Sequence, residues 1–326
     1  MQEKPCFIIT IDTEGDNLWA NPKQTSTKNA SFLFRFQELC EKYSMKPTYL
    51  TNYEMANDSV FKKLGLDIIR RKTGEIGMHL HAWDMPPDYP LTDNDFLYHP
   101  YLIEYPYEIM QQKIKTMTDL LENTFGTKML SHRAGRWGFD ERYACLLIEN
   151  GYRVDCSVTP FVSWKNDKGD PKQSGGTDYT KFPTMPYFID PQDISSPGHS
   201  TLLEVPVTIK DTYKWVNRFS HIFHRVSLVR RGLKYLFPKN WLRPNGRNIN
   251  TMKILLQNCI HNNSSYVEFM LHSSELMPGG SPIFKNEVSI DRLYCDLEAL
   301  FVEANKHFKG CTLSEFYQYV VRKNNS

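Results

Sequence analysis

Short β-rich runs alternate with longer helical patterns along most of this 326-residue chain, and this alternation restricts its fold more than any other feature. A strand–helix–strand order requires crossover connections, so we expect a largely parallel sheet. The predicted strands are residues 6–11, 47–51, 75–81, 129–133, 152–157, 202–208 and 266–272. The predicted helices are 31–44, 58–72, 106–126, 139–150, 248–262, 289–308 and 313–323. Because no glycine-rich dinucleotide-binding loop is present, seven strands favour an α/β fold of the distorted (β/α)7-type barrel class over a doubly wound sheet.

Two stretches interrupt this rhythm. Residues 159–200 are rich in Pro, Gly, Asp and Ser and contain several aromatic side chains, and residues 84–105 form a similar Pro- and Tyr-rich excursion. Long loops in a compact domain are usually functional or disordered, and the aromatic residues favour function. There is no internal repeat and no linker composition, so a single catalytic domain spanning residues 1–326, with elaborated loops, is predicted.

The net charge of +2, from 39 Lys and Arg against 37 Asp and Glu, conceals a basic segment. Residues 212–267 contain ten Lys and Arg and no Asp or Glu. The rest of the chain therefore has 29 basic and 37 acidic residues, a net charge of −8. Apolar positions at helical spacing predict a basic amphipathic insertion at about 212–247. It could contact a membrane surface, pack as an ordinary helix with a solvated basic side, or meet a phosphate of the substrate. Nucleic-acid binding is not expected, because no recognised module accompanies the charge.

The cysteines and the first residues indicate the compartment. Seven scattered cysteines without a Cys-x-x-Cys pair are typical of buried, reduced thiols. The first residues do not form a signal peptide, and no apolar run approaches the roughly 18 residues of a membrane-spanning helix. We therefore expect a cytoplasmic protein, located at the inner face of the membrane if the basic insertion contacts lipid.

Ionisable side chains stand at the carboxyl ends of five of the seven predicted strands. They are Asp12, Glu14 and Asp16; His79 and His81; His132 and Arg133; Asp155; and His272. Each of these could be structural when taken alone, because strand-end Asp often caps a helix. In a parallel barrel, however, the carboxyl ends of all strands meet at one face. The five together therefore predict one shared site.

The third predicted strand contains the most specific signal. His79 and His81 alternate with apolar residues, so both imidazoles project to the same face, roughly 7 Å apart along the backbone. Two imidazoles and a carboxylate from a neighbouring strand end would form a two-His, one-carboxylate metal site with open positions. Glu14 is the expected carboxylate and Asp12 is the alternative, while His81 could instead be structural. We predict one divalent metal ion, with zinc as the expected metal.

These motifs resemble the polysaccharide deacetylase family, the NodB-like carbohydrate esterases of family 4, over the chain from Ile8 to about Pro282. The family consists of metal-dependent amidases with a distorted (β/α) barrel. Its Thr-Phe-Asp-Asp motif is similar to residues 10–14 here, which implies Asp12 as catalytic base and Glu14 as metal ligand. Its His-Ser-x-x-His motif is similar to residues 79–83. That match implies His79 as a ligand and puts Trp83, a candidate for substrate binding, where the family has its second histidine.

The later family motifs imply the remaining site residues. An Arg-x-Pro stretch is similar to residues 133–137, with Arg133 orienting the catalytic Asp and with Arg136 and Trp137 facing the substrate. The strand-end Asp155 would be the carboxylate partner of the general acid. The motif Leu271-His272 implies His272 as that acid and Leu271 as a wall of the acetyl-methyl pocket. Base and acid are expected on opposite sides of the amide carbon, because they come from the first and last strands.

The resemblance implies a metal-dependent N-deacetylase that acts on an N-acetylated sugar or sugar carrier in glycan biosynthesis, a substrate that could be phosphate-bearing or lipid-linked. One alternative is a deformylase of a lipid-linked amino sugar, or another linear-amide hydrolase. The other is a catalytically silent glycan- or membrane-binding module on the same barrel, since Thr13 and Trp83 depart from the family pattern.

Overall fold

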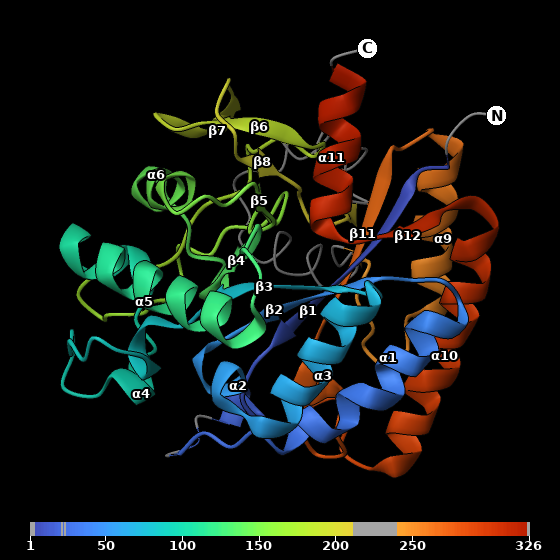
Figure 1. The fold of residues 1–326 in the computed structure, drawn as a ribbon, viewed down its shortest axis with the longest axis horizontal. Helices are drawn as coiled ribbons and strands as arrows, with labels where there is room; N and C mark the ends of the chain where they lie inside the picture. Colours follow the sequence, from blue (N-terminus) through green and yellow to red (C-terminus); the bar gives the residue numbers. More distant parts are fainter. Residues whose placement is uncertain (1–3, 21, 23, 211–239, 325–326) are drawn as a thin grey trace, which may run out of the picture.

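The structure, a computed structural model, describes residues 4–20, 22, 24–210 and 240–324. Seven parallel strands form its central sheet (Figure 1). They are β1 (Cys6–Thr13), β2 (Pro47–Thr51), β3 (Glu75–Leu80), β4 (Ser131–Ala134), β5 (Val154–Asp155), β8 (Leu203–Glu204) and β11 (Tyr266–His272). Their order is β11-β1-β2-β3-β4-β5-β8. The predicted (β/α)7-type fold class is confirmed.

The sheet curls into a barrel that is open between β8 and β11. The gap is bridged by Leu242, whose N–H donates to the Thr208 carbonyl (3.0 Å) and whose carbonyl accepts from the Met270 N–H (3.2 Å). Leu242 directly follows β10 (Asn240–Trp241), which pairs antiparallel with β9 (Ile209–Lys210). These short segments place the chain around residue 243 beside the carboxyl end of β11.

The remaining strands extend the barrel at its margins. β6 (Tyr187–Asp190) and β7 (Asp193–Pro197) form an antiparallel hairpin, and β6 pairs with β8. β12 (Lys309–Cys311) pairs with the first residues of β1. The hairpin lies within the stretch 159–200, which had been predicted as loop throughout, so that prediction is wrong for 187–197.

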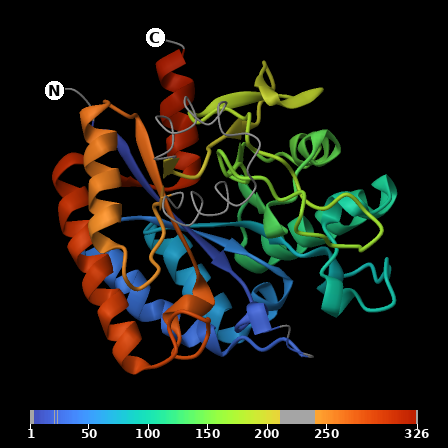
Figure 2. The same cartoon turned by 180° about the vertical axis from the view of Figure 1, so that it is seen from behind.

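Helices cover the outside of the barrel (Figure 2). They are α1 (Leu33–Lys42), α2 (Tyr53–Asn57), α3 (Ser59–Arg71), α4 (Asp95–Tyr98), α5 (Tyr107–Phe125), α6 (Glu141–Glu149), α9 (Ile249–His261), α10 (Glu287–His307) and α11 (Leu313–Asn324). In α3 the buried residues recur at helical spacing, and Asp58 caps its first turn by accepting from the backbone of Val60 and Phe61. α9 and α10 pack side by side (Figure 1).

Two hydrophobic clusters hold the layers together. The larger one lies between the strands and the surrounding helices. The smaller one is built mainly on the inward-facing side chains of the strands, and Leu313 and Phe316 of α11 pack into it. Parallel strands covered on both faces are nearly continuously apolar, and every residue of β1 is accordingly buried. Each fully buried large apolar side chain contributes about 1.5–3 kcal/mol.

Several predictions fall outside these elements. Most of the basic amphipathic insertion at about 212–247 lies outside the described residues, which resume at 240. Within the described ranges, no helix is long and apolar enough to span a membrane. The seven cysteines all lie in the described ranges and none forms a disulfide bond, but Cys295 is exposed and Cys145 only partly buried, contrary to the expectation that all would be buried.

Candidate active site and metal centre

A cavity of about 360 Å³ opens at the carboxyl ends of β1, β3, β4 and β11. Eight of the eleven predicted site residues line it: Asp12, Glu14, His79, His81, Trp83, Arg136, Trp137 and His272. The other lining residues are Leu18, Trp19, His99, Tyr101, Ala134, Trp164, Asp167 and Arg243. Parallel strands therefore bring together groups that are up to 260 positions apart in the sequence.

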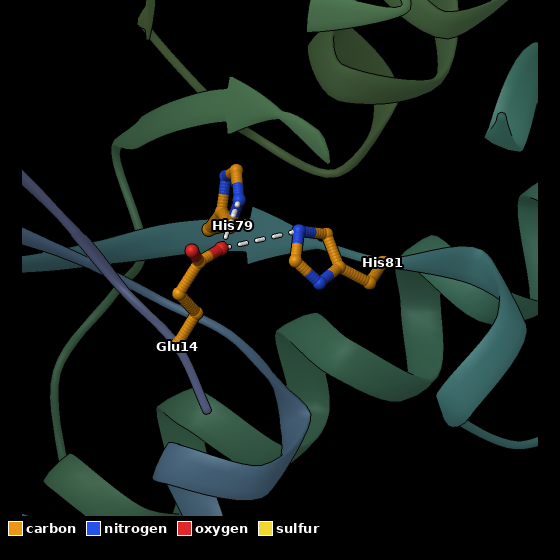
Figure 3. Close-up of side chains that lie close together, drawn as sticks. All are labelled: Glu14, His79 and His81. Atoms are coloured by element: carbon orange, nitrogen blue, oxygen red, sulfur yellow. Dashed lines mark ion pairs between the residues drawn. The ribbon is translucent and has the colours of Figure 1, made fainter. Parts of the chain in front are cut away.

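Glu14, His79 and His81 form a buried three-residue group whose potential ligand atoms all lie within 4.8 Å of one another (Figure 3). Glu14 Oε2 is 3.5 Å from His79 Nε2 and 3.4 Å from His81 Nε2. Two ligand atoms bound to one ion at about 2.0–2.2 Å in tetrahedral geometry are separated by about 3.3–3.6 Å. The two carboxylate–imidazole distances thus match the separation expected between two ligand atoms that bind the same cation.

The hydrogen bonding of His79 also fits a metal ligand. His79 Nδ1 lies 3.0 Å from the carbonyl oxygen of Arg133. A carbonyl only accepts, so Nδ1 carries the hydrogen, and in the neutral ring the Nε2 lone pair faces Glu14. Lone pairs of an imidazole and a carboxylate repel each other unless a cation or proton lies between them. The donor set of two imidazoles and one carboxylate suits zinc and other first-row divalent ions.

His81 is held in place by its neighbours. Its ring stacks on Trp83, with centroids 4.4 Å apart and an interplanar angle of 16°. On another side, a Cβ added to Gly135 would lie 2.6 Å from His81 Cδ2 and 2.2 Å from the Leu80 carbonyl oxygen, so only glycine allows this approach. Burial lowers the pKa of His81, which favours the neutral form that binds metals. Trp83 therefore supports His81 from the position at which the family has a histidine.

Asp12 is clamped by Arg133 beneath the cavity. Arg133 Nη1 donates to Asp12 Oδ1 (2.6 Å), while Nη2 donates to Thr10 Oγ1 (2.7 Å) and to Glu268. Burial opposes ionisation of Asp12, but the positive charge of Arg133 and the neighbouring imidazoles outweigh it and hold its pKa well below its usual range. Burial raises the pKa of Glu268 to about 7, with Arg133 opposing this effect. This geometry supports the prediction that Arg133 orients Asp12.

His272 stands beside Asp12 on the paired strand β11. Asp12 and His272 are in register, and His272 Nε2 is 3.6 Å from Asp12 Oδ2 and 3.8 Å from Glu14 Oε1. The expectation that base and acid lie on opposite sides of the amide carbon therefore does not hold. The first and last strands of a curled barrel are neighbours, so their side chains meet on one wall of the cavity.

The other ring nitrogen of His272 has two partners. Arg243 Nη2 lies 2.9 Å from Nδ1, and Glu275 Oε2 lies 3.4 Å from it, so an unprotonated Nδ1 accepts from Arg243 and a protonated Nδ1 donates to Glu275. Glu275 Oε2 also accepts from the His272 backbone N–H (2.8 Å), and Oε1 accepts from Arg243 Nη2 (3.1 Å). Burial would raise the pKa of Glu275, but the charges of Arg243 and His272 lower it to about 2. An ionised, buried Glu275 therefore anchors both His272 and Arg243.

The predicted pairing of Asp155 with His272 is wrong. Asp155 Oδ1 is 2.6 Å from His132 Nδ1, and His132 Nε2 is 2.7 Å from the Tyr143 hydroxyl, all fully buried. The physical reason is strand order: β5 is separated from β11 by β1 to β4, whereas Asp155 and His132 are in direct register. Asp155 serves a buried network outside the cavity, and Glu275 takes the place expected for it.

Leu271 is also misplaced in the sequence-based prediction. It is fully buried in the larger hydrophobic cluster and is absent from the cavity lining. Successive side chains on a strand point to opposite faces, so a strand that directs His272 into the cavity directs Leu271 toward the helices. No role in an acetyl pocket is retained for Leu271.

Arg136 and Trp137 project from a strained turn after β4. Both have positive φ, 53° and 64°, which is costly for residues other than glycine. Trp137 lies over the Arg133 guanidinium at 5.0 Å and stacks on Trp164 with an interplanar angle of 12°. Arg136 stacks on the Tyr101 ring at 4.3 Å. The turn thus contributes Trp137 and the Arg136 guanidinium to an aromatic wall of the cavity.

The residues that the sequence reasoning missed come from loops or from short local contacts. Tyr101 and Trp164 lie in the two long aromatic stretches that the sequence predicts to be functional, and Trp19 lies in a short 3-10 helix (Leu18–Ala20), but no spacing rule places these residues in the site. Arg243 belongs to the basic segment, for which contact with a substrate phosphate is one predicted role, but its position beside His272 has no signal in the sequence. Glu275 offered the clearest signal, because it follows His272 by three positions in a short helical turn, where i and i+3 side chains meet.

Comparisons with known proteins support the fold. No family model matches the sequence, and no curated protein does. A polysaccharide deacetylase structure from Mycobacterium smegmatis is similar, with a TM-score of 0.56, 12% identity, and coverage of 99% of this chain and 93% of that one. A glycoside hydrolase/deacetylase from Parabacteroides distasonis gives a TM-score of 0.65 at 9% identity, with coverage of 98% and 72%.

A third similar structure is 4-alpha-glucanotransferase from Thermococcus litoralis, with a TM-score of 0.53, 16% identity, and coverage of 98% of this chain and 40% of that one. The chain therefore has the fold of the NodB-like polysaccharide deacetylases, as its motifs predicted. Identities this low establish the fold alone, and a glucanotransferase shares it. The reaction must be argued from the side chains.

Proposed function

We propose that the protein is a metal-dependent N-deacetylase that removes the acetyl group from an N-acetylated sugar or glycan precursor. The observation that supports this best is one cavity containing the Glu14–His79–His81 group, Asp12 clamped by Arg133, and His272. A metal-ligand set, a carboxylate kept ionised and an imidazole are the groups that hydrolysis of an unreactive amide requires.

The walls of the cavity suit a sugar. Trp83, Trp137, Trp164 and Tyr101 line it on the side of β3 and β4, and Trp19 lies against His272, with ring centroids 4.9 Å apart. Flat aromatic faces pack against the apolar faces of sugar rings, while the polar groups deeper in the cavity fix orientation. A volume of about 360 Å³ falls in the range of small-molecule sites.

Glu14, His79 and His81 would hold a divalent ion, which supplies Lewis acidity that polarises a carbonyl and lowers the pKa of water. Asp12 accepts the proton of the attacking water, since its lowered pKa keeps the carboxylate ionised and Arg133 fixes its orientation. In the imidazolium form, with the Nδ1 hydrogen directed to Glu275, His272 Nε2 faces Asp12 and Glu14 and is placed to protonate the departing sugar nitrogen. Glu275 holds the His272 backbone and ring in that position.

The test is acetate release from N-acetylated hexosamines and their oligomers by zinc-loaded protein. We expect activity in the wild type, and a loss of about 10²–10⁴-fold in Asp12→Asn and in His272→Ala. Matched controls are Asp119→Asn and His261→Ala, both on exposed helix surfaces away from the cavity, which should retain wild-type activity. Undiminished activity in Asp12→Asn would refute the role given to Asp12.

The alternatives give different products in the same assay. Formate instead of acetate from N-formylated substrates would identify a deformylase. Neither product, together with sugar binding by a metal-free protein, would identify a silent binding module on this barrel.

The same proposal includes a cytoplasmic location and contact of the segment 212–247 with a lipid surface or lipid-linked substrate. Its support is the ten positive charges between 212 and 267 without an acidic residue. Sedimentation with vesicles of phosphatidylcholine, alone or with phosphatidylglycerol, tests the contact. Binding only to the anionic vesicles is expected, and no binding to either would contradict it.

A further inference from the structure

Arg243 lines the cavity but has no part in the reaction as derived above. It follows the short strand β10 and is positioned by Glu275, which accepts from its Nη2 at 3.1 Å. Glu275 is fully buried and ionised, so it fixes the guanidinium at the wall of the cavity. The same Nη2 lies 2.9 Å from His272 Nδ1.

The guanidinium has donors that the protein does not use. Arginine carries five N–H donors in a planar fork. Within the described part of the chain, both polar contacts of the Arg243 guanidinium are made by Nη2, and Nε and Nη1 have no partner. The side chain is 24% exposed, and the residue lines the cavity. A fork of this kind binds phosphate or carboxylate groups, which accept two parallel hydrogen bonds.

A second arginine adds positive charge to the same cavity. The Arg136 guanidinium donates to the backbone carbonyls of Tyr98, His99 and Lys168, and no described carboxylate lies within 4.0 Å of it. Among the acidic residues that line the cavity, Asp12 is paired with Arg133 and Glu14 with two imidazoles, and Asp167 lies beside Tyr101, whose hydroxyl donates to its backbone carbonyl.

The position of Arg243 indicates where the anionic group must be. His272 Nε2 faces the proposed reaction centre, and Nδ1 of the same ring faces Arg243. Only the His272 imidazole therefore separates the Arg243 guanidinium from the proposed position of the substrate amide nitrogen. We propose that the substrate is an acidic amino sugar with a phosphate or carboxylate on a carbon next to the amide-bearing carbon, and that Arg243 binds this group. This inference rests on the proposed deacetylase function and narrows its substrate class.

The experiment compares three acetamido sugars with zinc-loaded protein: N-acetylglucosamine, its 1-phosphate, and N-acetylmuramic acid, whose O3 carries a lactyl ether that ends in a carboxylate. The galacto epimers of the first two are included. Acetate release gives kcat/KM for each compound. Binding is measured separately by quenching of tryptophan fluorescence, since Trp19, Trp83, Trp137 and Trp164 line the cavity. The variants are Arg243→Gln and Arg243→Lys, and the matched control is Arg35→Gln, an exposed arginine paired with Asp291.

We expect at least one anionic sugar to exceed its neutral parent in kcat/KM. In Arg243→Gln this preference should fall by about 10- to 100-fold, the effect of losing charge-assisted hydrogen bonds. Arg243→Lys should lose only part of it, because it keeps the charge without the fork, and Arg35→Gln should keep it. Which anionic compound is preferred distinguishes a phosphate from a carboxylate.

Equal kcat/KM for neutral and anionic sugars would overturn the inference and leave the deacetylase standing. An unchanged preference for the anionic sugar in Arg243→Gln, in a variant with a wild-type circular dichroism spectrum, would also overturn the inference. If Arg243→Gln does not fold, an unchanged preference in Arg243→Lys overturns it instead. If no acetate is released but the 1-phosphate binds more tightly than its parent, with this difference lost in Arg243→Gln, the anion site stands and the deacetylase proposal fails.

Discussion

Replacing Glu268 by glutamine should change how the stability of the protein depends on pH. Glu268 lies inside the barrel behind Asp12 and shares Arg133 with it. Burial raises its pKa from 4.5 to about 7 in the folded protein. A carboxyl with a raised folded pKa contributes stability that is fully present below the unfolded pKa and is lost as the pH rises through the folded pKa. The loss therefore falls between about pH 4.5 and pH 7.

The size of this effect follows from the pKa difference. At about 1.4 kcal/mol for each pKa unit, the change from 4.5 to about 7 corresponds to about 3 kcal/mol. Glutamine resembles the protonated carboxyl and does not titrate. The free energy of unfolding of Glu268→Gln, relative to wild type, should therefore rise by about 3 kcal/mol between pH 4.5 and pH 8.

Urea unfolding at pH 4.5, 5.5, 6.5 and 8 measures this difference for both proteins. Glu108→Gln, on the exposed side of α5, controls for the replacement of a glutamate by glutamine. If the wild type and Glu268→Gln give parallel stability curves over this range, the electrostatic description of the Asp12–Arg133–Glu268 group is wrong.

Three further predictions concern the same site. Arg133→Met should destabilise the fold by about 3–5 kcal/mol at pH 7, because it leaves the buried, ionised Asp12 without its cation; urea unfolding measures this, and a loss no larger than that of the exposed Arg35→Met would contradict it. His81→Ala should weaken zinc binding by at least about 100-fold, since it removes one of three ligands; competition with a chelating dye measures the affinity, and unchanged affinity would show that His81 is structural. Trp83→Ala should weaken zinc binding by about 10-fold by releasing the His81 ring, whereas Trp83→Phe should largely preserve it; equal affinities in both variants would remove the supporting role of Trp83.

Local sequence patterns were enough to predict the core of the site. The strand containing His79 and His81 alternates with apolar residues, and alternation alone puts both imidazoles on one face. Asp12 and Glu14 follow a continuously apolar strand, so they had to emerge at the carboxyl edge of the sheet. Parallel strands share that edge, which is why residues from the beginning and the end of the chain could be expected to meet.

Strand order and loop paths were not encoded in those patterns. Asp155 stands at a strand end like the others, but only the order of the strands shows that its neighbour is His132 and not His272. The neighbourhood of Asp12 and His272 also depends on strand order, because β11 pairs directly with β1. Arg243 reaches the site because Leu242 bridges the gap between β8 and β11, a contact with no sequence signature.

The most direct test of the metal centre is anomalous X-ray diffraction from crystals of the zinc-loaded protein, measured above and below the zinc absorption edge. One strong peak is predicted about 2.0–2.2 Å from Glu14 Oε2, His79 Nε2 and His81 Nε2, within the cavity that Asp12 and His272 line. A zinc-loaded crystal without a peak there, or with zinc held only by other residues, would contradict the proposed metal-dependent site.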